Sequence, residues 1–218
     1  MLLLVDLDNT LVDRATAFSL WAAGFVESLG GSELDVSWLI AADRDGYEPR
    51  ETLARATKKR FETDLGVGAL VETLLYGHVG SITMDTVTAD ALRNARETGW
   101  TIGVVTNGTT AQQTLKIQKV GLERYVDAVV ISEAAGVQKP DPQIFEIAAH
   151  RLGAELAGGW MVGDHPRADI MGGRAAGLRT GWVSRGTPWP VDLAAPVLSA
   201  ATAAEVINSV IMFDRQTD

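Results

Sequence analysis

From about Thr86 onward the sequence alternates between helix-like segments and short strand-like runs, and a glycine closes each helix-like segment. The expected helices span residues 86–98, 110–120, 142–152 and 167–176, and the strands that follow them span 100–105, 127–131, 160–163 and 180–183. Glycine suits the position after the last helical turn because it adopts positive φ angles without steric cost. A further apolar run opens the chain at residues 1–5. Helix–strand units that repeat after an opening strand predict an α/β fold with a doubly wound parallel sheet.

A block of helical sequence separates the opening strand from this alternation. Apolar residues recur there at helical spacing before a glycine pair: Phe18, Trp21, Phe25 and Leu29, then Gly30-Gly31. A polar turn at 43–50 precedes a second expected helix from Arg50 to about residue 65, and a third is expected around 70–76. We therefore expect residues 1–13 and 84–218 to form the sheet domain, with residues 14–83 as a helical subdomain inserted after the first strand.

Composition excludes several classes of protein. The net charge of −9 over 218 residues argues against nonspecific binding to nucleic acid or to an anionic membrane, which needs a basic surface. The sequence has no cysteine, which excludes disulfides, zinc–thiolate sites and thiol nucleophiles, and fits a reducing cytoplasm as the expected location. No run approaches the ~20 apolar residues of a membrane span and the first residues lack a basic segment, so we expect neither an anchor nor a signal peptide. The sequence does not indicate an oligomeric state.

Polar residues follow the strand-like runs where the strands are expected to end. They are Asp6 and Asp8, Thr106 and Asn107, Lys139, Asp164 and Asp169. The carboxyl ends of parallel strands meet at one edge of a sheet, and ligands bind there in open α/β folds. We therefore expect carboxylates, a lysine, a hydroxyl and an amide to gather in one crevice.

This set of side chains suits phosphoryl transfer. Four carboxylates without cysteine or a histidine cluster favour a hard cation that binds oxygen, so Mg²⁺ is the expected cofactor. Asp6 is a candidate to attack phosphorus, and Asp8 to protonate the leaving alkoxide and then deprotonate a water molecule. Lys139 and Thr106, with the metal, would stabilise the charge on the oxygens of the transferring group.

Four segments in order resemble the motifs of the haloacid dehalogenase (HAD) superfamily. They are Asp-Leu-Asp-Asn-Thr-Leu at 6–11, Val-Thr-Asn-Gly at 105–108, Gln-Lys-Pro-Asp-Pro at 138–142 and Val-Gly-Asp-His-Pro-Arg-Ala-Asp-Ile at 162–170. The resemblance runs through the whole sheet domain, and the helical block falls where that family has its C1-type cap. It implies a Rossmann-like catalytic core with an inserted helical cap.

The resemblance also implies roles for individual residues. Asp6 would be the nucleophile and Asp8 the general acid and base. Mg²⁺ would be held by Asp6, by the backbone carbonyl of Asp8 and by Asp164. Dehalogenase members of the superfamily generally lack an acid two residues after the nucleophile, so the presence of Asp8 favours a phosphatase.

The remaining motif residues would handle the phosphoryl group. Thr106 and Asn107 would bind it, and Lys139 would counter its charge and orient the nucleophile. Asp169 would lie in the second shell of the metal or help to hold Lys139.

We therefore predict a Mg²⁺-dependent phosphatase that acts on a small phosphorylated metabolite, such as a sugar phosphate, phosphoglycolate or a nucleoside monophosphate. Two alternatives remain at this stage. One is a phosphomutase of the β-phosphoglucomutase type, which returns the phosphoryl group to its substrate. The other is a non-catalytic binding or regulatory protein on the same scaffold.

Several further polar and aromatic residues lie outside these four motifs, and His165 lies within the last of them. Arg44, Tyr47 and Arg50 lie in the polar turn where C1-type caps commonly place a substrate-specificity loop, although a solvated turn explains them equally well. The three histidines lack metal-ligand spacing and are interpreted as structural or surface residues: His78, His150 and His165. Whether His165 lines the crevice and whether Trp189 covers its mouth are left open.

Overall fold

The structure is a computed structural model that describes residues 1–215. It divides into two compact units, one formed by Met1–Val12 and Met84–Asp218 and the other by Asp13–Thr83. Asp13, expected in the sheet domain, begins the helical unit. Its carboxylate accepts a hydrogen bond from the Thr16 N–H at 3.0 Å, and its own N–H donates to the Thr83 carbonyl at 3.0 Å. The first bond caps α1, and the second ties the two ends of the inserted segment together.

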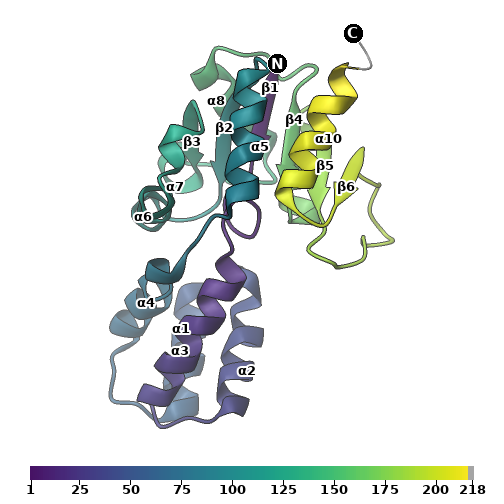
Figure 1. Cartoon of the computed structure of the whole chain (residues 1–218). Helices are drawn as coiled ribbons and strands as arrows, with labels where there is room; N and C mark the ends of the chain where they lie inside the picture. The colour runs from purple at the N-terminus through teal and green to yellow at the C-terminus, as the bar shows by residue number, and fades with distance from the viewer. Residues whose placement is uncertain (216–218) are drawn as a thin grey trace. The chain divides into compact units, whose positions relative to one another are not determined.

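A six-stranded sheet forms the centre of the first unit (Figure 1). Its strands are β1 (Leu2–Val5), β2 (Thr101–Thr106), β3 (Ala128–Ile131), β4 (Trp160–Gly163), β5 (Arg179–Val183) and β6 (Leu198–Ala200). They lie in the order β3-β2-β1-β4-β5-β6, and every neighbouring pair is parallel. The predicted α/β fold, a Rossmann-like doubly wound sheet with an inserted helical subdomain, is confirmed. β1 is a central strand because Leu4 pairs with Gly103 of β2 on one side and with Met161 of β4 on the other.

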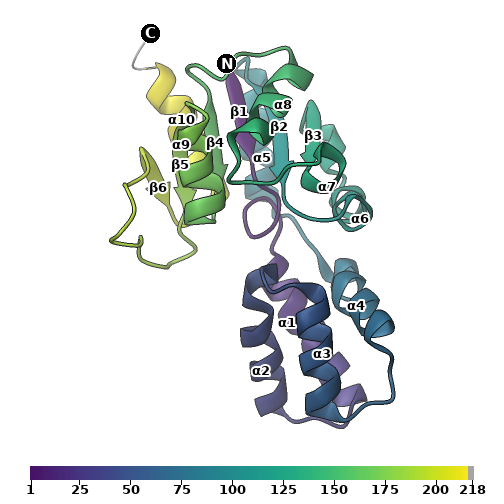
Figure 2. The same ribbon diagram turned by 180° about the vertical axis from the view of Figure 1, so that it is seen from behind.

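Helices cover both faces of the sheet. They are α5 (Thr86–Glu97), α6 (Thr110–Val120), α7 (Ser132–Ala135), α8 (Pro142–Leu152), α9 (Gly172–Ala175) and α10 (Ala203–Arg215). Figures 1 and 2 show α5 and α10 over one face and α8 and α9 over the other. The carboxylate of Asp141 caps α8 by accepting a hydrogen bond from the Gln143 N–H, and Pro142 occupies the first helical position, where its missing N–H costs nothing.

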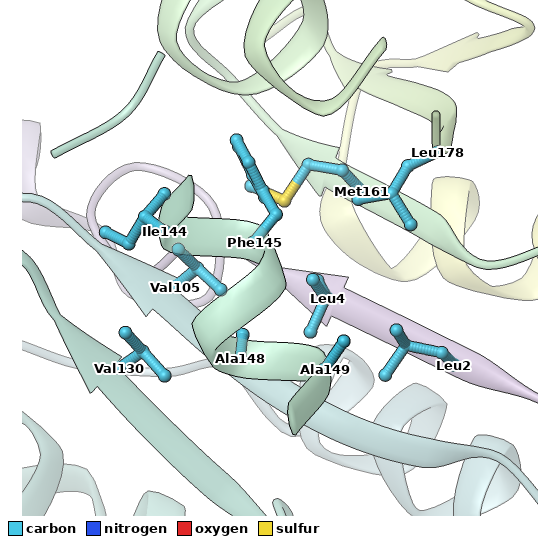
Figure 3. Close-up of a cluster of buried hydrophobic side chains, with 10 residues drawn as sticks. All are labelled: Leu2, Leu4, Val105, Val130, Ile144, Phe145, Ala148, Ala149, Met161 and Leu178. Atoms are coloured by element: carbon cyan, nitrogen blue, oxygen red, sulfur yellow. The ribbon is translucent and has the colours of Figure 1, made fainter. Parts of the chain in front are cut away.

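The apolar cluster in Figure 3 holds α8 against the sheet. The helix contributes residues spaced three and four apart, and the strands contribute the opposite side: Ile144, Phe145, Ala148 and Ala149 against Leu2, Leu4, Val105, Val130 and Met161. Phe145 is fully buried, which contributes about 1.5–3 kcal/mol relative to leaving such a side chain exposed. Because α8 is fixed in this way, the loop that leads into it, including Lys139, is held close to the ends of β1 and β2.

The C-terminal part of this unit differs from the sequence prediction. The last strand was expected at 180–183, but β6 and α10 follow β5. β6 has only three residues, none of them fully buried, so it carries little apolar periodicity. The helix expected at 167–176 is a π-helical turn, Pro166–Met171, followed by the short helix α9. In that wide turn the His165 carbonyl accepts hydrogen bonds from the N–H groups of both Asp169 and Ile170.

The helical unit contains α1 (Arg14–Ser28), α2 (Glu33–Asp43), α3 (Arg50–Phe61) and α4 (Val67–Tyr76). Its core includes Phe18, Val26, Leu39, Leu53, Leu70 and Leu74. The sequence prediction did not place α2, of which only Leu39 and Asp43 are fully buried, and it extended α3 to about residue 65. Among residues 1–215, no helix is long and apolar enough to cross a membrane.

Candidate active site

Asp6 lies immediately after the central strand β1. Its backbone N–H donates to the Val162 carbonyl of β4 at 2.9 Å, which continues the pairing of the two strands by one residue. Its buried carboxylate accepts a hydrogen bond from Lys139 Nζ at 2.5 Å and a longer one from the Thr10 hydroxyl at 3.4 Å. The candidate nucleophile is therefore held by backbone pairing and by a lysine.

Lys139 joins two carboxylates. Its Nζ lies 2.5 Å from Asp6 Oδ1 and 2.7 Å from Asp169 Oδ1, and the side chain is buried. Burial lowers the pKa of Lys139, but the charges of Asp169 and Asp6 raise it by more, so its net pKa is raised and the ammonium stays charged. The expected proximity of Asp169 to Lys139 is present, and the second oxygen of Asp169 accepts a hydrogen bond from the His165 N–H at 2.9 Å.

Asn107 fixes the loop that carries Lys139. Its Nδ2 donates to the Lys139 carbonyl, and its Oδ1 accepts from the Lys139 N–H, both at 2.9 Å. The side chain of Asn107 is thus used to hold the lysine loop. The expected contact of Asn107 with a phosphoryl group stays a prediction.

Three carboxylates converge near this lysine. Asp6, Asp164 and Asp169 each offer an oxygen, and these oxygens lie within 4.8 Å of one another. Burial raises the pKa of Asp6 to about 7, with Lys139 opposing the rise and Asp169 adding to it. Burial also raises the pKa of Asp164 well above its usual range, and repulsion from Asp6 and Asp169 raises it further. Two cations, Lys139 and Arg185, contact these three carboxylates and do not fully neutralise them, and an all-oxygen donor set of this kind fits Mg²⁺.

Asp164 has two further contacts that the sequence prediction did not include. Arg185 NH1 donates to Asp164 Oδ2 at 3.2 Å, and Trp182 Nε1 donates to the Asp164 carbonyl at 2.8 Å. Both partners come from β5 or the residues just after it. They hold the end of β4 beside the end of β5.

Asp8 is bound by a second lysine, which the sequence prediction also missed. Lys116 Nζ lies 2.8 Å from Oδ1 and 2.7 Å from Oδ2 of Asp8, and Gln113 Nε2 donates to Oδ2 at 2.9 Å. Both residues belong to α6. The buried positions of this helix are Gln112, Gln113, Lys116 and Ile117, so its buried face is mostly polar, which the spacing of its apolar residues did not reveal.

Thr106 is the last residue of β2 and is fully buried. Its hydroxyl accepts a hydrogen bond from Gln113 Nε2 at 2.6 Å. The same amide nitrogen therefore contacts both Thr106 and Asp8. The structure brings Thr106 and Asp8 to one side chain of α6, as expected if the strand ends share a site.

His165 and Trp189 have structural contacts. His165 Nδ1 accepts hydrogen bonds from the Ala168 N–H at 3.0 Å and the Arg167 N–H at 3.2 Å, and so caps the π-helical turn. Burial lowers the pKa of His165 despite the opposing charge of Asp169, which keeps the imidazole neutral. Trp189 packs edge-on against Trp182 with ring centroids 4.9 Å apart.

The polar turn of the helical unit contains a buried ion cluster. Asp43 is 1% exposed and binds Arg14 through both oxygens, at 2.7 and 3.0 Å, and Arg50 through Oδ1 at 2.7 Å. Arg50 also donates to the Glu48 carbonyl. Arg50, a candidate for either substrate contact or a solvated turn, is therefore bound by residues of the turn itself.

The other two candidates in this turn face solvent. The side chain of Arg44 is 69% exposed and lies 3.5 Å from Glu48, and Tyr47 is 47% exposed. A contact of Arg44, Tyr47 or Arg50 with substrate remains a prediction.

Comparison with known proteins gives one family and a consistent fold. A family model described as haloacid dehalogenase-like hydrolase matches residues 1–177. A phosphoserine phosphatase from Thermus thermophilus is 36% identical over 115 residues, which are 53% of this chain and 46% of that protein. Pyrimidine 5'-nucleotidase YjjG from Escherichia coli is 41% identical over 97 residues, which are 44% of this chain and 43% of that protein. The match thus spans about half the length of these curated relatives.

A solved structure extends the similarity of fold over almost the whole chain. YfnB from Bacillus subtilis, bound to magnesium, has a TM-score of 0.78 at 21% identity, covering 96% of this chain and 97% of that chain. At this identity the likeness concerns the fold.

Proposed function

The chain belongs to the haloacid dehalogenase-like hydrolases, and from this premise we propose that it is a Mg²⁺-dependent phosphatase that hydrolyses a small phosphate monoester. The observation that carries the proposal is the pair of carboxylates Asp6 and Asp8, each bound to its own buried lysine. The phosphatase and nucleotidase among the relatives support the same class of reaction.

In the first step, a carboxylate oxygen of Asp6 attacks phosphorus while the bond from phosphorus to the leaving oxygen breaks. Asp8 in its protonated form gives its proton to that oxygen, so the alcohol leaves neutral and an aspartyl phosphate forms on Asp6. Lys139 holds Asp6 in position for the attack and, with Thr106, offsets negative charge on the phosphoryl oxygens.

In the second step, water attacks the phosphorus of the aspartyl phosphate. Asp8, now a carboxylate, accepts the proton from the water, and the bond between phosphorus and Asp6 breaks. Inorganic phosphate leaves and Asp6 is regenerated. The sum of the two steps is ester plus water giving alcohol plus phosphate.

The residues that would hold Mg²⁺ are Asp6, Asp164 and the backbone carbonyl of Asp8, with Asp169 beside them. When bound, the ion supplies positive charge that offsets the repulsion among these carboxylates and that of the substrate phosphate. Asp169 contributes through Lys139, which it keeps charged. Arg185, which donates to Oδ2 of Asp164, would orient that carboxylate.

The helical unit would select the leaving group, as a cap inserted between β1 and α5. If the insertion recognises the leaving group, the motif residues, which would act on the phosphoryl group, do not identify the substrate by themselves. The relatives' names, phosphoserine phosphatase and pyrimidine 5'-nucleotidase, suggest amino-acid phosphates and nucleoside monophosphates for a first screen, beside sugar phosphates and phosphoglycolate.

The test is a phosphate-release assay over such a panel with the purified protein, in Mg²⁺ and in EDTA. We expect release from at least one ester in Mg²⁺, loss of release in EDTA and recovery when Mg²⁺ is added back. No release from any ester would contradict the proposal and favour a binding protein. An isomerised sugar phosphate formed only with added bisphosphate would favour a phosphomutase.

A further inference from the structure

Helix α6 holds the carboxylate of Asp8 from two directions. The Lys116 ammonium contacts both oxygens of Asp8, and the Gln113 amide contacts Oδ2. Three charge-assisted contacts with the Asp8 carboxylate restrict its rotation about the Cβ–Cγ bond. From this contact geometry we propose that Lys116 and Gln113 are positioning residues that align Asp8 for proton transfer to the leaving oxygen, an inference that rests on the proposed phosphatase function.

The burial of Lys116 is hard to explain by stability. Its side chain is 1% exposed, and lysine is almost never fully buried unless it is paired, as Lys116 is with Asp8. Removing an ammonium and a carboxylate from water costs several kcal/mol, and well-packed apolar side chains often serve stability as well or better. Asp8 itself keeps 20% of its side chain exposed, so the pair presents its carboxylate and not its ammonium to solvent.

The side-chain amide of Gln113 is also oriented toward the polar groups of the site. Its Nε2 lies 2.9 Å from Asp8 Oδ2, 2.6 Å from Thr106 Oγ1 and 3.2 Å from the Asn107 carbonyl. Its own Oε1 is buried and has no hydrogen-bond partner in the described part of the chain. An unsatisfied buried acceptor costs about 1–3 kcal/mol, and the contacts of Nε2 retain this orientation.

The local sequence makes this arrangement possible. The Thr109 hydroxyl caps α6 by accepting from the Gln112 N–H, so the helix begins at Thr110, shortly after β2 ends at Thr106. Gln113 and Lys116, three residues apart, then lie on one face of the helix. Gly108 has φ +148°, and a Cβ there would lie 3.0 Å from Gln113 Cδ. A glycine at this position therefore gives the glutamine its room.

The consequence depends on the leaving group. An alkyl phosphate releases a strongly basic alkoxide that must be protonated as it departs, whereas p-nitrophenyl phosphate releases a weakly basic phenolate that needs little help. A misaligned Asp8 therefore slows alkyl esters more than aryl esters. General acid catalysis contributes typically about 10²–10⁴-fold, so the selective loss should reach ~10²-fold.

The experiment compares Lys116→Met with wild type on the best alkyl ester of the panel and on p-nitrophenyl phosphate, with kcat/KM as the readout. We expect kcat/KM for the alkyl ester to fall by ~10²-fold and that for the aryl ester by less than ~10-fold. Gln113→Leu should shift the same ratio in the same direction by a smaller factor. Because both rates come from one preparation, their ratio does not depend on the fraction that is folded.

Two controls separate positioning from other effects. Lys119→Met removes an exposed lysine of the same helix and should leave the ratio unchanged. In an Asp8→Asn background, Lys116→Met should change the ratio by less than ~2-fold, because residues that act through one another are not additive.

The outcomes distinguish this inference from the proposed function. If the wild type is active and Lys116→Met lowers kcat/KM for both esters equally, or for neither, the positioning role is overturned. The proposed phosphatase function is then unaffected. A full selective loss in the Asp8→Asn background also overturns it, since Lys116 would then not act through Asp8. A wild type that hydrolyses no ester overturns both.

Discussion

Replacing Asp43 by asparagine should destabilise the helical unit strongly. Asp43 is the shared partner of the buried Arg14 guanidinium and the partly buried Arg50 guanidinium, with contacts of 2.7 and 3.0 Å to Arg14 and 2.7 Å to Arg50. The asparagine would keep the shape of the side chain, but it would replace one acceptor oxygen by an NH₂ group facing a donor. Arg14, itself 4% exposed, would then lie buried without a countercharge.

The magnitude follows from the geometry. Removing one partner from a buried ion pair costs about 3–5 kcal/mol, because the remaining charge stays desolvated. Domains of ordinary stability have only about 5–15 kcal/mol in total, so the variant loses a large share of the stability of this unit. A matched control is Glu51→Gln on α3. It breaks the ion pair of Glu51 with Arg55, whose side chains are 64% and 65% exposed, respectively. Exposed pairs of this spacing contribute about 0.5 kcal/mol or less.

Hydrogen exchange measured by mass spectrometry gives the assay, because peptides from α2 and α3 report on the helical unit by itself. A loss of about 3–5 kcal/mol speeds exchange there roughly 100- to 4000-fold, since each 1.4 kcal/mol is a factor of ten. Peptides from β1 and β2 serve as the internal reference. A loss below about 1 kcal/mol in α2 and α3 would refute the view that this cluster is a buried, mutually dependent set of charges.

The pH dependence supplies a second check. Burial raises the pKa of Asp43, but Arg14 and Arg50 lower it by more, so the net pKa lies below the ordinary 3.8. A carboxylate with a depressed folded-state pKa stabilises the protein fully above its ordinary pKa and loses that contribution as the pH falls through the folded value. The difference in the free energy of unfolding between wild type and Asp43→Asn should therefore be constant at neutral pH and become smaller below pH 3.8. A gap that does not narrow would count against the ion cluster.

Three further predictions concern the site and the turn. Asp6→Asn should abolish phosphate release while leaving the circular dichroism spectrum unchanged; surviving turnover would exclude Asp6 as the nucleophile. Lys139→Met should lower kcat by about 10²–10³-fold, as loss of a preorganised donor does. An unchanged kcat would show that Lys139 neither holds Asp6 for attack nor offsets the charge of the phosphoryl oxygens. Arg44→Ala should change KM for the physiological substrate, spare small generic phosphate esters and leave the melting temperature unchanged, whereas Arg50→Ala should lower that temperature through Asp43. Equal KM values for every substrate in Arg44→Ala would exclude a contact of Arg44 with substrate.

The sequence was informative wherever chemistry and secondary structure coincide locally. Asp6, Thr106 and Asp164 each end or follow a short buried strand, and a parallel sheet brings such positions to one edge. The alternation of helices and strands after Thr86 is likewise a local pattern, and it predicted the main elements of the sheet unit up to β5. The glycines that follow these helices allowed the helix C-termini to be predicted more precisely.

Features that depend on packing between distant segments could not be predicted in this way. Lys116 and Gln113 contact Asp8 across more than a hundred residues of sequence, and spacing alone does not tell which helix face meets the site. β6 is too short to carry a periodic signal, and α2 buries too few apolar residues. The ion pair of Arg50 with Asp43 also could not be predicted, because the burial of Asp43 depends on tertiary structure.

The central position of β1 also has a consequence for the order of folding during synthesis. β1 is made before the partners on either side of it, since Leu2 pairs with Thr101 and Val5 with Val162. The helical unit, by contrast, is one continuous stretch, Asp13–Thr83, whose contacts are local and form quickly. A nascent chain that has not yet reached Trp160 can therefore fold its helices and pair β1 with β2, but it lacks β4, whose Val162 carbonyl accepts the hydrogen bond of the Asp6 N–H. The site stays incomplete on the ribosome until β4 has emerged.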